Sequence, residues 1–190
     1  MITAKQEAAI RDLLATMPEI AVGVGSKEKA CSIAALNLAL TGTLTDKVPD
    51  CMSRVIGRWT INVQDRMPAT IRDSAAWREL LVLAAGTGRE HEAERRALVL
   101  SWMWDALALA QPQADERGYG EAWATMLRYR TFKAAADAAA YADAAAYAAA
   151  DAAAAAYAAA YAAAGGTIDP VGMLRRLVAV TDARALAVRP

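Results

Sequence analysis

Two arginines one helical turn apart are the first residues that could bind a ligand. Arg54 and Arg58 lie on the polar side of an expected helix, with Asn62 and Asp65 further along that side. Side chains four residues apart are neighbours on a helix, and guanidinium groups bind carboxylate and phosphate oxygens through paired hydrogen bonds. The pair predicts an anion site. The alternative is a solvated helix face with Arg58 tied to an acidic neighbour.

A glycine-containing turn, AAGTGREHEAERR, supplies a second group. Gly86, Thr87 and Gly88 come directly before an expected helix start, and Arg89 follows them. Backbone amides there, with the Thr87 hydroxyl and the Arg89 guanidinium, could hold a phosphate or a carboxylate. The turn matches neither GxGxxG nor the P-loop. The alternative is a plain turn with Thr87 as helix cap, where the following glutamates would compete with an anion.

The residues around the single histidine do not form a recognisable catalytic set. His91 has Glu90, Glu92 and Glu94 beside it and could act as an acid–base group. No nucleophile motif or metal triad accompanies it in the sequence, and an exposed histidine in the first turn of a helix explains it as well. We therefore expect a protein that is not an enzyme and needs no cofactor, with an enzyme using His91 as the alternative.

Composition argues against several other classes. Cys31 and Cys51 form no CxxC pair, which argues against a zinc site; they could be a disulfide or two reduced, buried thiols. Basic and acidic residues balance at 21 each, whereas a general nucleic-acid-binding protein has a basic excess. The N-terminal residues lack the order of a signal peptide, and aspartates interrupt the alanine run. We expect a cytoplasmic protein that does not enter membranes.

Helical signals dominate the first part of the chain and predict a helical core domain over residues 1–112. Helices are expected after the capping box of Thr3 and Gln6, over 26–42 with Ser26 as cap, over 51–64 with Asp50 as cap, after Ser74, and over 89–109. The segment 58–64 could instead be a strand, because Trp, Thr, Ile and Val favour sheets. Its apolar stripe favours a helix.

Alanine dominates the next part, with 24 alanines among the 31 residues 134–164. Alanine is the best helix former, so we expect a long helix within 113–166. It begins near Tyr119, and the sequence leaves open whether it is continuous to Ala164. An alanine seam would allow close helix packing, and the lack of lysine and arginine over 134–174 favours a homo-oligomer or packing on the core. Asp169 and Pro170 then open a short helix in the last part, 167–190.

The segment from Lys29 to Asp105, which includes KACSIAALNLALTG and LVLAAGTGREHEAERR, resembles a family of proteins encoded by bacteriophages and prophages. Alanine-rich tails of similar texture also occur in that group. The resemblance implies a protein acting in the cytoplasm of an infected bacterial host. Small accessory phage proteins often counter host defence, some by sequestering nucleotide signals in oligomeric pockets. The resemblance assigns no catalytic residues.

Together these observations predict an all-α protein, a helical bundle core followed by a long alanine-rich helix and a short C-terminal helix. We expect a non-enzymatic, oligomeric phage accessory protein that sequesters an anionic, nucleotide-type small ligand to counter host defence. The expected ligand-binding residues are Arg54, Arg58, Thr87 and Arg89, with no metal. The alternative is a structural or interaction protein whose alanine-rich helix drives assembly or docks a partner.

Overall fold

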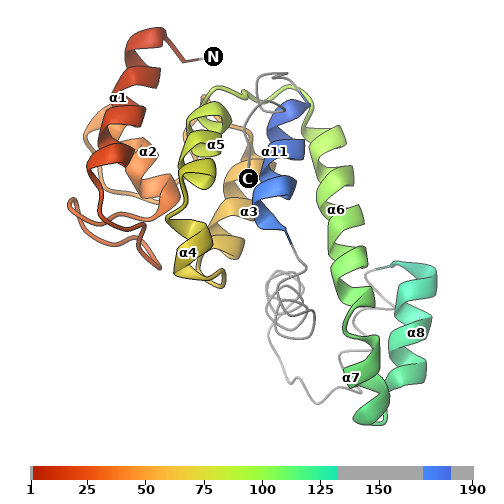
Figure 1. The fold of residues 1–190 in the computed structure, drawn as a ribbon. Helices are drawn as coiled ribbons and strands as arrows, with labels where there is room; N and C mark the ends of the chain where they lie inside the picture. The colour runs from red at the N-terminus through yellow and green to blue at the C-terminus, as the bar shows by residue number, and fades with distance from the viewer. Residues whose placement is uncertain (1, 132–168, 181–190) are drawn as a thin grey trace. The chain divides into compact units, whose positions relative to one another are not determined.

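The fold is that of a computed structural model, which describes residues 2–131 and 169–180 (Figure 1). The regular elements in these two ranges are all α-helices, which confirms the predicted all-α class. The chain divides into two compact units, Met1–Leu98 with Pro170–Pro190, and Val99–Asp169. In this division the C-terminal helix belongs with the first helices of the chain.

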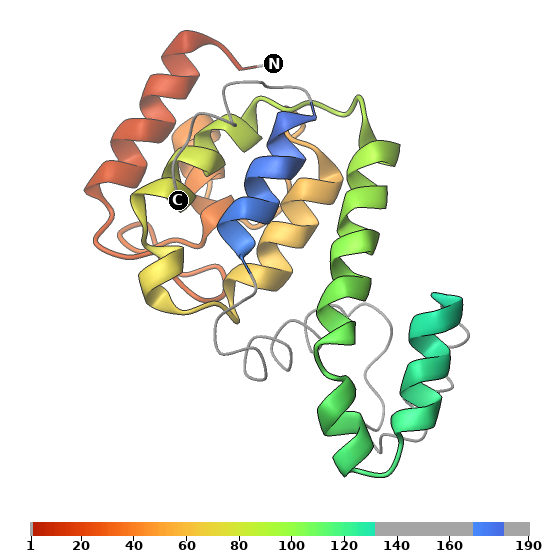
Figure 2. The same ribbon diagram turned by 45° about the vertical axis from the view of Figure 1, so that its right-hand side comes forward.

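Among the described residues, the first unit contains six helices and the start of a seventh. They are α1 (Ala4–Thr16), α2 (Ser32–Thr41), α3 (Arg54–Gln64), α4 (Ala69–Arg72), α5 (Ala75–Ala85), α11 (Pro170–Ala179) and the first part of α6 (Glu92–Ala108). Within this unit α1 contacts α2 and α5, and α2 also contacts α3 (Figures 1 and 2). Helix α11 lies against α5 and α3, so it completes the core of the first unit.

The core of the first unit is built around Trp77 of α5. Its side chain is fully buried, its ring centroid is 6.2 Å from that of Trp59, and its Nε1–H donates to Ser32 Oγ at 3.1 Å. Aliphatic side chains from the surrounding helices fill the rest: Ile33 and Leu36, Ile56 and Val63, Leu80 and Leu81, and Leu174 and Leu177. The spacings of three residues in α2 and α11 and of seven in α3 keep each pair on one face of its helix, as in amphipathic helices packed on one another.

Local capping signals place several helix ends as predicted. Thr3 and Gln6 form the capping box of α1, and the Ser74 hydroxyl accepts the N–H of Trp77 at the start of α5. Gly42 ends α2 with a φ of 73°, the left-handed conformation that glycine adopts without strain. The segment 58–64 is helical, which excludes the strand alternative.

Two predicted helix starts are wrong. Helix α2 begins at Ser32, not after Ser26, and the Sγ of Cys31 accepts the N–H of Ala34. Backbone pairing keeps the residues before it out of the helix, since Ser26 N–H donates to the carbonyl of Lys29 at 2.8 Å. Helix α3 begins at Arg54 with Ser53, rather than Asp50, as its N-cap.

The second unit contains the remainder of α6 with α7 (Gln111–Glu116) and α8 (Gly120–Tyr129). Its core contains Trp104, Leu107 and Met126. Helix α8 ends at Tyr129, because Arg130 takes a φ of 50° and its N–H closes the last turn on Met126 at 2.8 Å. The helix that begins near Tyr119 is therefore interrupted at Arg130. The alanine-rich part, 134–164, lies outside the described residues.

No described helix has the length and apolar character needed to cross a lipid bilayer.

Candidate functional site

The two predicted arginines on α3 lie as the sequence indicated. Arg54 and Arg58 are both exposed and one turn apart. Their guanidinium groups make no hydrogen bond or ion pair with the residues that the structure describes. Asp65, an acidic residue on the same side, does not pair with Arg58; its Oδ1 accepts the N–H of Gly23 at 3.1 Å. The pair thus has the geometry of an open, solvated helix face.

The N-terminus of α3 already holds an anionic group of the protein itself. Glu92 Oε1 accepts the N–H of Arg54 at 2.7 Å, and its Oε2 accepts the N–H of Val55 at 3.1 Å. The first amides of a helix carry partial positive charge and favour a carboxylate at this position. A ligand anion at this helix end would have to displace Glu92.

Thr87 and Arg89 take part in contacts that hold the start of α3. Thr87 is 4% exposed, and its hydroxyl accepts the N–H of Ser53 at 3.0 Å and donates to the carbonyl of Ala84 at 2.7 Å. Arg89 Nη2 donates to Asp50 Oδ1 at 3.1 Å. These bonds give both side chains a structural role, and their role in ligand binding stays a prediction.

The glycine-containing turn presents its carbonyl groups to a buried arginine. Arg95 is fully buried and donates to the carbonyls of Glu90 at 3.0 Å and Thr87 at 3.3 Å. Its Nε–H also donates to the carbonyl of Leu177 in α11 at 3.3 Å. Burial lowers the pKa of the Arg95 guanidinium, because the charged form is desolvated. Arg95 of α6 therefore binds both the turn and α11. The sequence did not indicate this role of Arg95.

His91 lies near a single acidic side chain, and the two cysteines are not bonded to each other. His91 is exposed at the start of α6, with its Nδ1 3.6 Å from Glu94 Oε1. Both cysteines are free, so the disulfide alternative is not realised. Burial raises the pKa of the Cys51 thiol. Within the ranges 2–131 and 169–180, no group of three or more His, Cys, Asp and Glu side chains could hold a metal ion.

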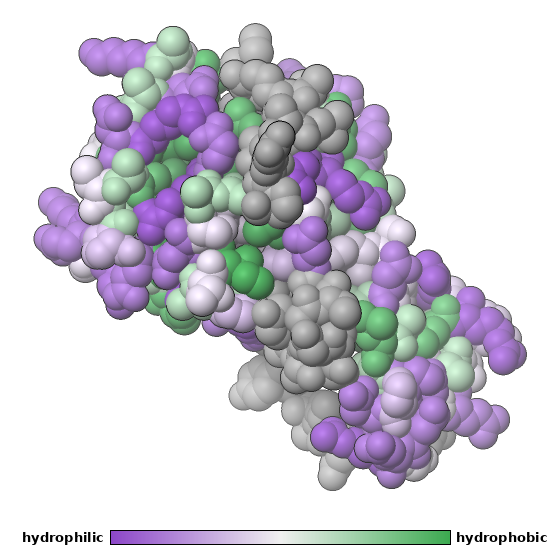
Figure 3. Space-filling model, in the orientation of Figure 1, coloured by the Kyte–Doolittle hydropathy of each residue, from purple (hydrophilic) through white to green (hydrophobic). Residues whose placement is uncertain are grey.

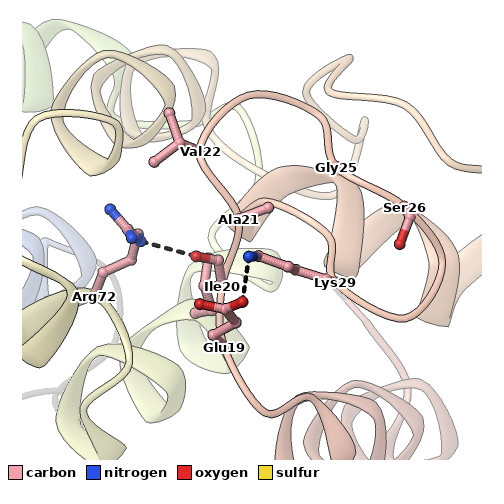
Figure 4. Close-up of a pocket in the computed structure, with 8 residues that line it drawn as sticks. All are labelled: Glu19, Ile20, Ala21, Val22, Gly25, Ser26, Lys29 and Arg72. Atoms are coloured by element: carbon pink, nitrogen blue, oxygen red, sulfur yellow. Dashed lines mark hydrogen bonds and ion pairs between the residues drawn. The ribbon is translucent and has the colours of Figure 1, made fainter.

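An open pocket of about 420 Å³ lies in the first unit, beside the loop between α1 and α2 (Figure 4). We call it the Arg72 pocket. It is lined by Glu19, Ile20, Ala21, Val22, Gly25, Ser26, Lys29 and Arg72. Seven of these residues come from the loop, and Arg72 comes from the end of α4.

The loop is held in place at both polar groups of Ile20. Arg72 Nε donates to the Ile20 carbonyl at 2.8 Å, and Asp73 Oδ1 accepts the Ile20 N–H at 2.6 Å. Further along, the N–H of Ala21 donates to the carbonyl of Ala30 at 3.0 Å. The loop is therefore fixed to the core by bonds at its base, which gives the pocket a defined wall.

Gly25 allows the loop to close on itself. It has a φ of 79°, and a Cβ atom there would lie 2.1 Å from the carbonyl oxygen of Lys29 and 2.8 Å from the Cβ of Ala21. Only glycine combines this backbone conformation with such a close approach. The glycine thus determines the path of the backbone beside Ser26 and Lys29.

Arg72 is the most buried charge that lines the pocket. It is 8% exposed, and its Nη1 donates to the carbonyls of Gln64 and Met67, both at 3.2 Å. In the described part of the chain, its guanidinium has no carboxylate partner, and its Nη2 makes no hydrogen bond. Lys29 forms an ion pair with Glu19 at the pocket. Two cationic side chains and one anionic side chain leave the lining with an excess of one positive charge.

This arrangement is suited to binding an anion. Carbonyl groups fix the orientation of the Arg72 guanidinium, and a guanidinium donates charge-assisted hydrogen bonds to carboxylate and phosphate oxygens. Arg72 was not among the residues predicted from the sequence. An arginine is normally expected at the surface, and the carbonyls that bind this one come from the separate segments of Ile20, Gln64 and Met67.

Comparisons with protein-family models, with curated proteins and with solved structures give no match to this chain.

Proposed function

We propose that the chain is a non-enzymatic binding protein for a small ligand that carries a phosphate or carboxylate group, and that this group binds in the Arg72 pocket. The observation that carries the proposal is the buried guanidinium of Arg72, which lines an open pocket and has no carboxylate partner among the described residues. Burying a charge without a counter-ion costs free energy, and an anion in the pocket would offset part of that cost.

Lys29 and Glu19 form an ion pair at the pocket, and a bound anion would alter this pair. The two side chains are each close to half exposed. A bound anion would attract Lys29 and would be repelled by Glu19. The affinity for an anion should therefore respond in opposite directions when each charge is removed.

Three further parts of the proposal come from the sequence alone: the type of ligand, the oligomer and the role in the host. The nucleotide-type ligand, its sequestration by an oligomer and the role against host defence are supported by the resemblance to phage-encoded proteins. The proposed site of the anion, the Arg72 pocket, is supported by the structure. It is not the site formed by the predicted residues Arg54, Arg58, Thr87 and Arg89. That set remains a second possible location, which the same experiment tests.

Calorimetric titration with inorganic phosphate and with AMP tests the proposal. Lys29→Gln should weaken binding about threefold, through the loss of its charge rather than of a direct contact, and Glu19→Gln should strengthen it. Lys27→Gln is the matched control, because it removes the same charge from the same loop at an exposed residue that does not line the pocket. Absence of binding would overturn the proposal. Loss of binding in Arg58→Gln but not in Lys29→Gln would move the site to α3.

An interaction protein is the second candidate function, favoured by exposed apolar side chains in the second unit. Tyr129 is 63% exposed and Leu109 is 43% exposed, while hydrophilic residues cover much of the face drawn in Figure 3. Exposed aromatic and aliphatic side chains are common at protein–protein contacts. Light scattering of the full chain and of Tyr129→Ser tests this function. A lower mass for the variant supports assembly through this surface, and an unchanged mass argues against it.

A further inference from the structure

The exposed apolar side chains of the first unit are concentrated beside the Arg72 pocket. Four large hydrophobic residues are exposed in the part of the chain that the structure describes, namely Val22, Val24, Leu109 and Tyr129. Leu109 and Tyr129 belong to the second unit. Val22 and Val24, at 57% and 36% exposure, both belong to the loop that forms the pocket, and Val22 lines it.

The backbone around these valines is fixed, so their exposure is built into the loop. The N–H of Gly23, between them, donates to Asp65 at 3.1 Å. The carbonyl of Val24 accepts the N–H of Cys31 at 3.1 Å. A loop backbone that is already held in place loses little conformational freedom when a ligand covers it.

Val22 and Arg72 are arranged so that one ligand could contact both. In the view of Figure 4 their side chains lie on the same side of the backbone at Ile20 and Ala21, while Lys29 and Ser26 lie on the other. Ligand pockets generally combine apolar lining with a small number of placed polar groups. Here the apolar lining is supplied by Ile20, Ala21 and Val22.

We infer that the ligand is an organic anion, bearing a phosphate or carboxylate group on an apolar or aromatic body, with the anionic group at Arg72 and the organic part against Val22. This inference rests on the proposed function, because it names the class of ligand for the same pocket. Bare phosphate would use only the charged part of the pocket and would leave the Val22 methyl groups in water. An apolar organic part would remove them from water, which is favourable in proportion to the area covered.

Calorimetric titration of the full chain with three probes tests the inference: inorganic phosphate, glycerol 1-phosphate and phenyl phosphate. Phenyl phosphate should bind at least about fourfold more tightly than glycerol 1-phosphate, the factor for roughly one buried methylene-sized group. Val22→Thr keeps the branched shape and should remove most of this advantage, so that the ratio of the two ester affinities falls toward one. Leu109→Ser, which changes an exposed apolar residue of the other unit, should alter neither affinity.

The possible failures separate the inference from the proposed function. If none of the three probes binds, the proposed function fails. If all three bind equally, depend on Lys29 and are unaffected by Val22→Thr, the pocket binds phosphate but the inference is wrong. If Val22→Thr weakens all three probes equally, Val22 shapes the loop instead of contacting the organic group, and the inference is again overturned.

Discussion

Arg72 Nε donates to the main-chain carbonyl of Ile20 at 2.8 Å, and this bond joins α4 to the loop between α1 and α2. The next residue, Asp73, accepts the N–H of Ile20 at 2.6 Å. Two consecutive side chains thus bind both polar groups of one loop residue. The same guanidinium lines the pocket, so the residue that holds the loop is also the one proposed to bind the ligand.

Replacing Arg72 should destabilise the fold. Arg72→Met leaves the carbonyls of Ile20, Gln64 and Met67 without their donor in a buried environment, and we expect the free energy of unfolding to fall by about 3 kcal/mol. Urea denaturation measures this change. Arg58→Met, at an exposed position of α3, is the control and should change the value by less than about 0.5 kcal/mol. Equal effects of the two variants would contradict the assigned role of Arg72.

Removing the Glu92 carboxylate should weaken the start of α3. Glu92→Ala removes both acceptors from the N–H groups of Arg54 and Val55, and we expect a loss of about 1 kcal/mol in the free energy of unfolding. Glu92→Gln should lose less, because it keeps one acceptor oxygen. The control, Glu116→Ala, changes an exposed glutamate near the end of α7. A Glu92→Ala protein as stable as this control would show that the cap contributes nothing.

Replacing either of two loop glycines by alanine should change stability and anion binding to different extents. Both have positive φ, but an added Cβ meets the carbonyl oxygen of Lys29 only at Gly25 and meets nothing within 4 Å at Gly23. Gly23→Ala should cost about 1 kcal/mol, the usual penalty for a left-handed alanine, and keep anion binding. Gly25→Ala should cost more and weaken anion binding, because the loop backbone must move. Thermal unfolding with parallel phosphate titrations checks this, and equal behaviour of the two variants would refute it.

The two cysteines should differ in reactivity. Burial raises the pKa of Cys51, so less thiolate is present at pH 8 than for a free cysteine, and iodoacetamide should modify it more slowly. Its rate should still rise as the pH increases. Cys31 is fully buried and should react only after unfolding in urea. Mass spectrometry of alkylated peptides measures both rates. Rapid modification of Cys31 in the folded protein would contradict this burial pattern.

The sequence predicts best those features that depend on neighbouring residues. The starts of α1 and α5 follow from the Thr3 and Ser74 caps, since each cap bonds to an amide three residues away. Ser26 is an equally good cap by residue type, yet the loop pairing between Ala21 and Ala30 keeps it outside the helix. The Ala21–Ala30 bond joins residues nine apart and overrides the capping preference of Ser26. The residues next to Ser26 do not reveal this bond.

The candidate site was less predictable for the same reason. The exposed stripe of Arg54 and Arg58 follows from helical spacing alone. Arg72 and Arg95 are buried because carbonyls from other segments meet them, at Ile20 and Leu177 respectively. Such partners come from segments that are distant in the sequence and meet only in the folded chain. The sequence therefore indicates where charged residues lie on a helix, but it does not show which of them the fold buries.

The central claim is that an anion binds at Arg72, and NMR titration of the isotope-labelled full chain with inorganic phosphate tests it most directly. The proposal predicts saturable shifts of the Arg72 Nε–H resonance and of the Gly25 and Ser26 amides. It also predicts that the Nε–H resonances of Arg54, Arg58 and Arg89 stay unchanged. Shifts confined to those three arginines, or no saturable shift at any residue, would contradict the claim.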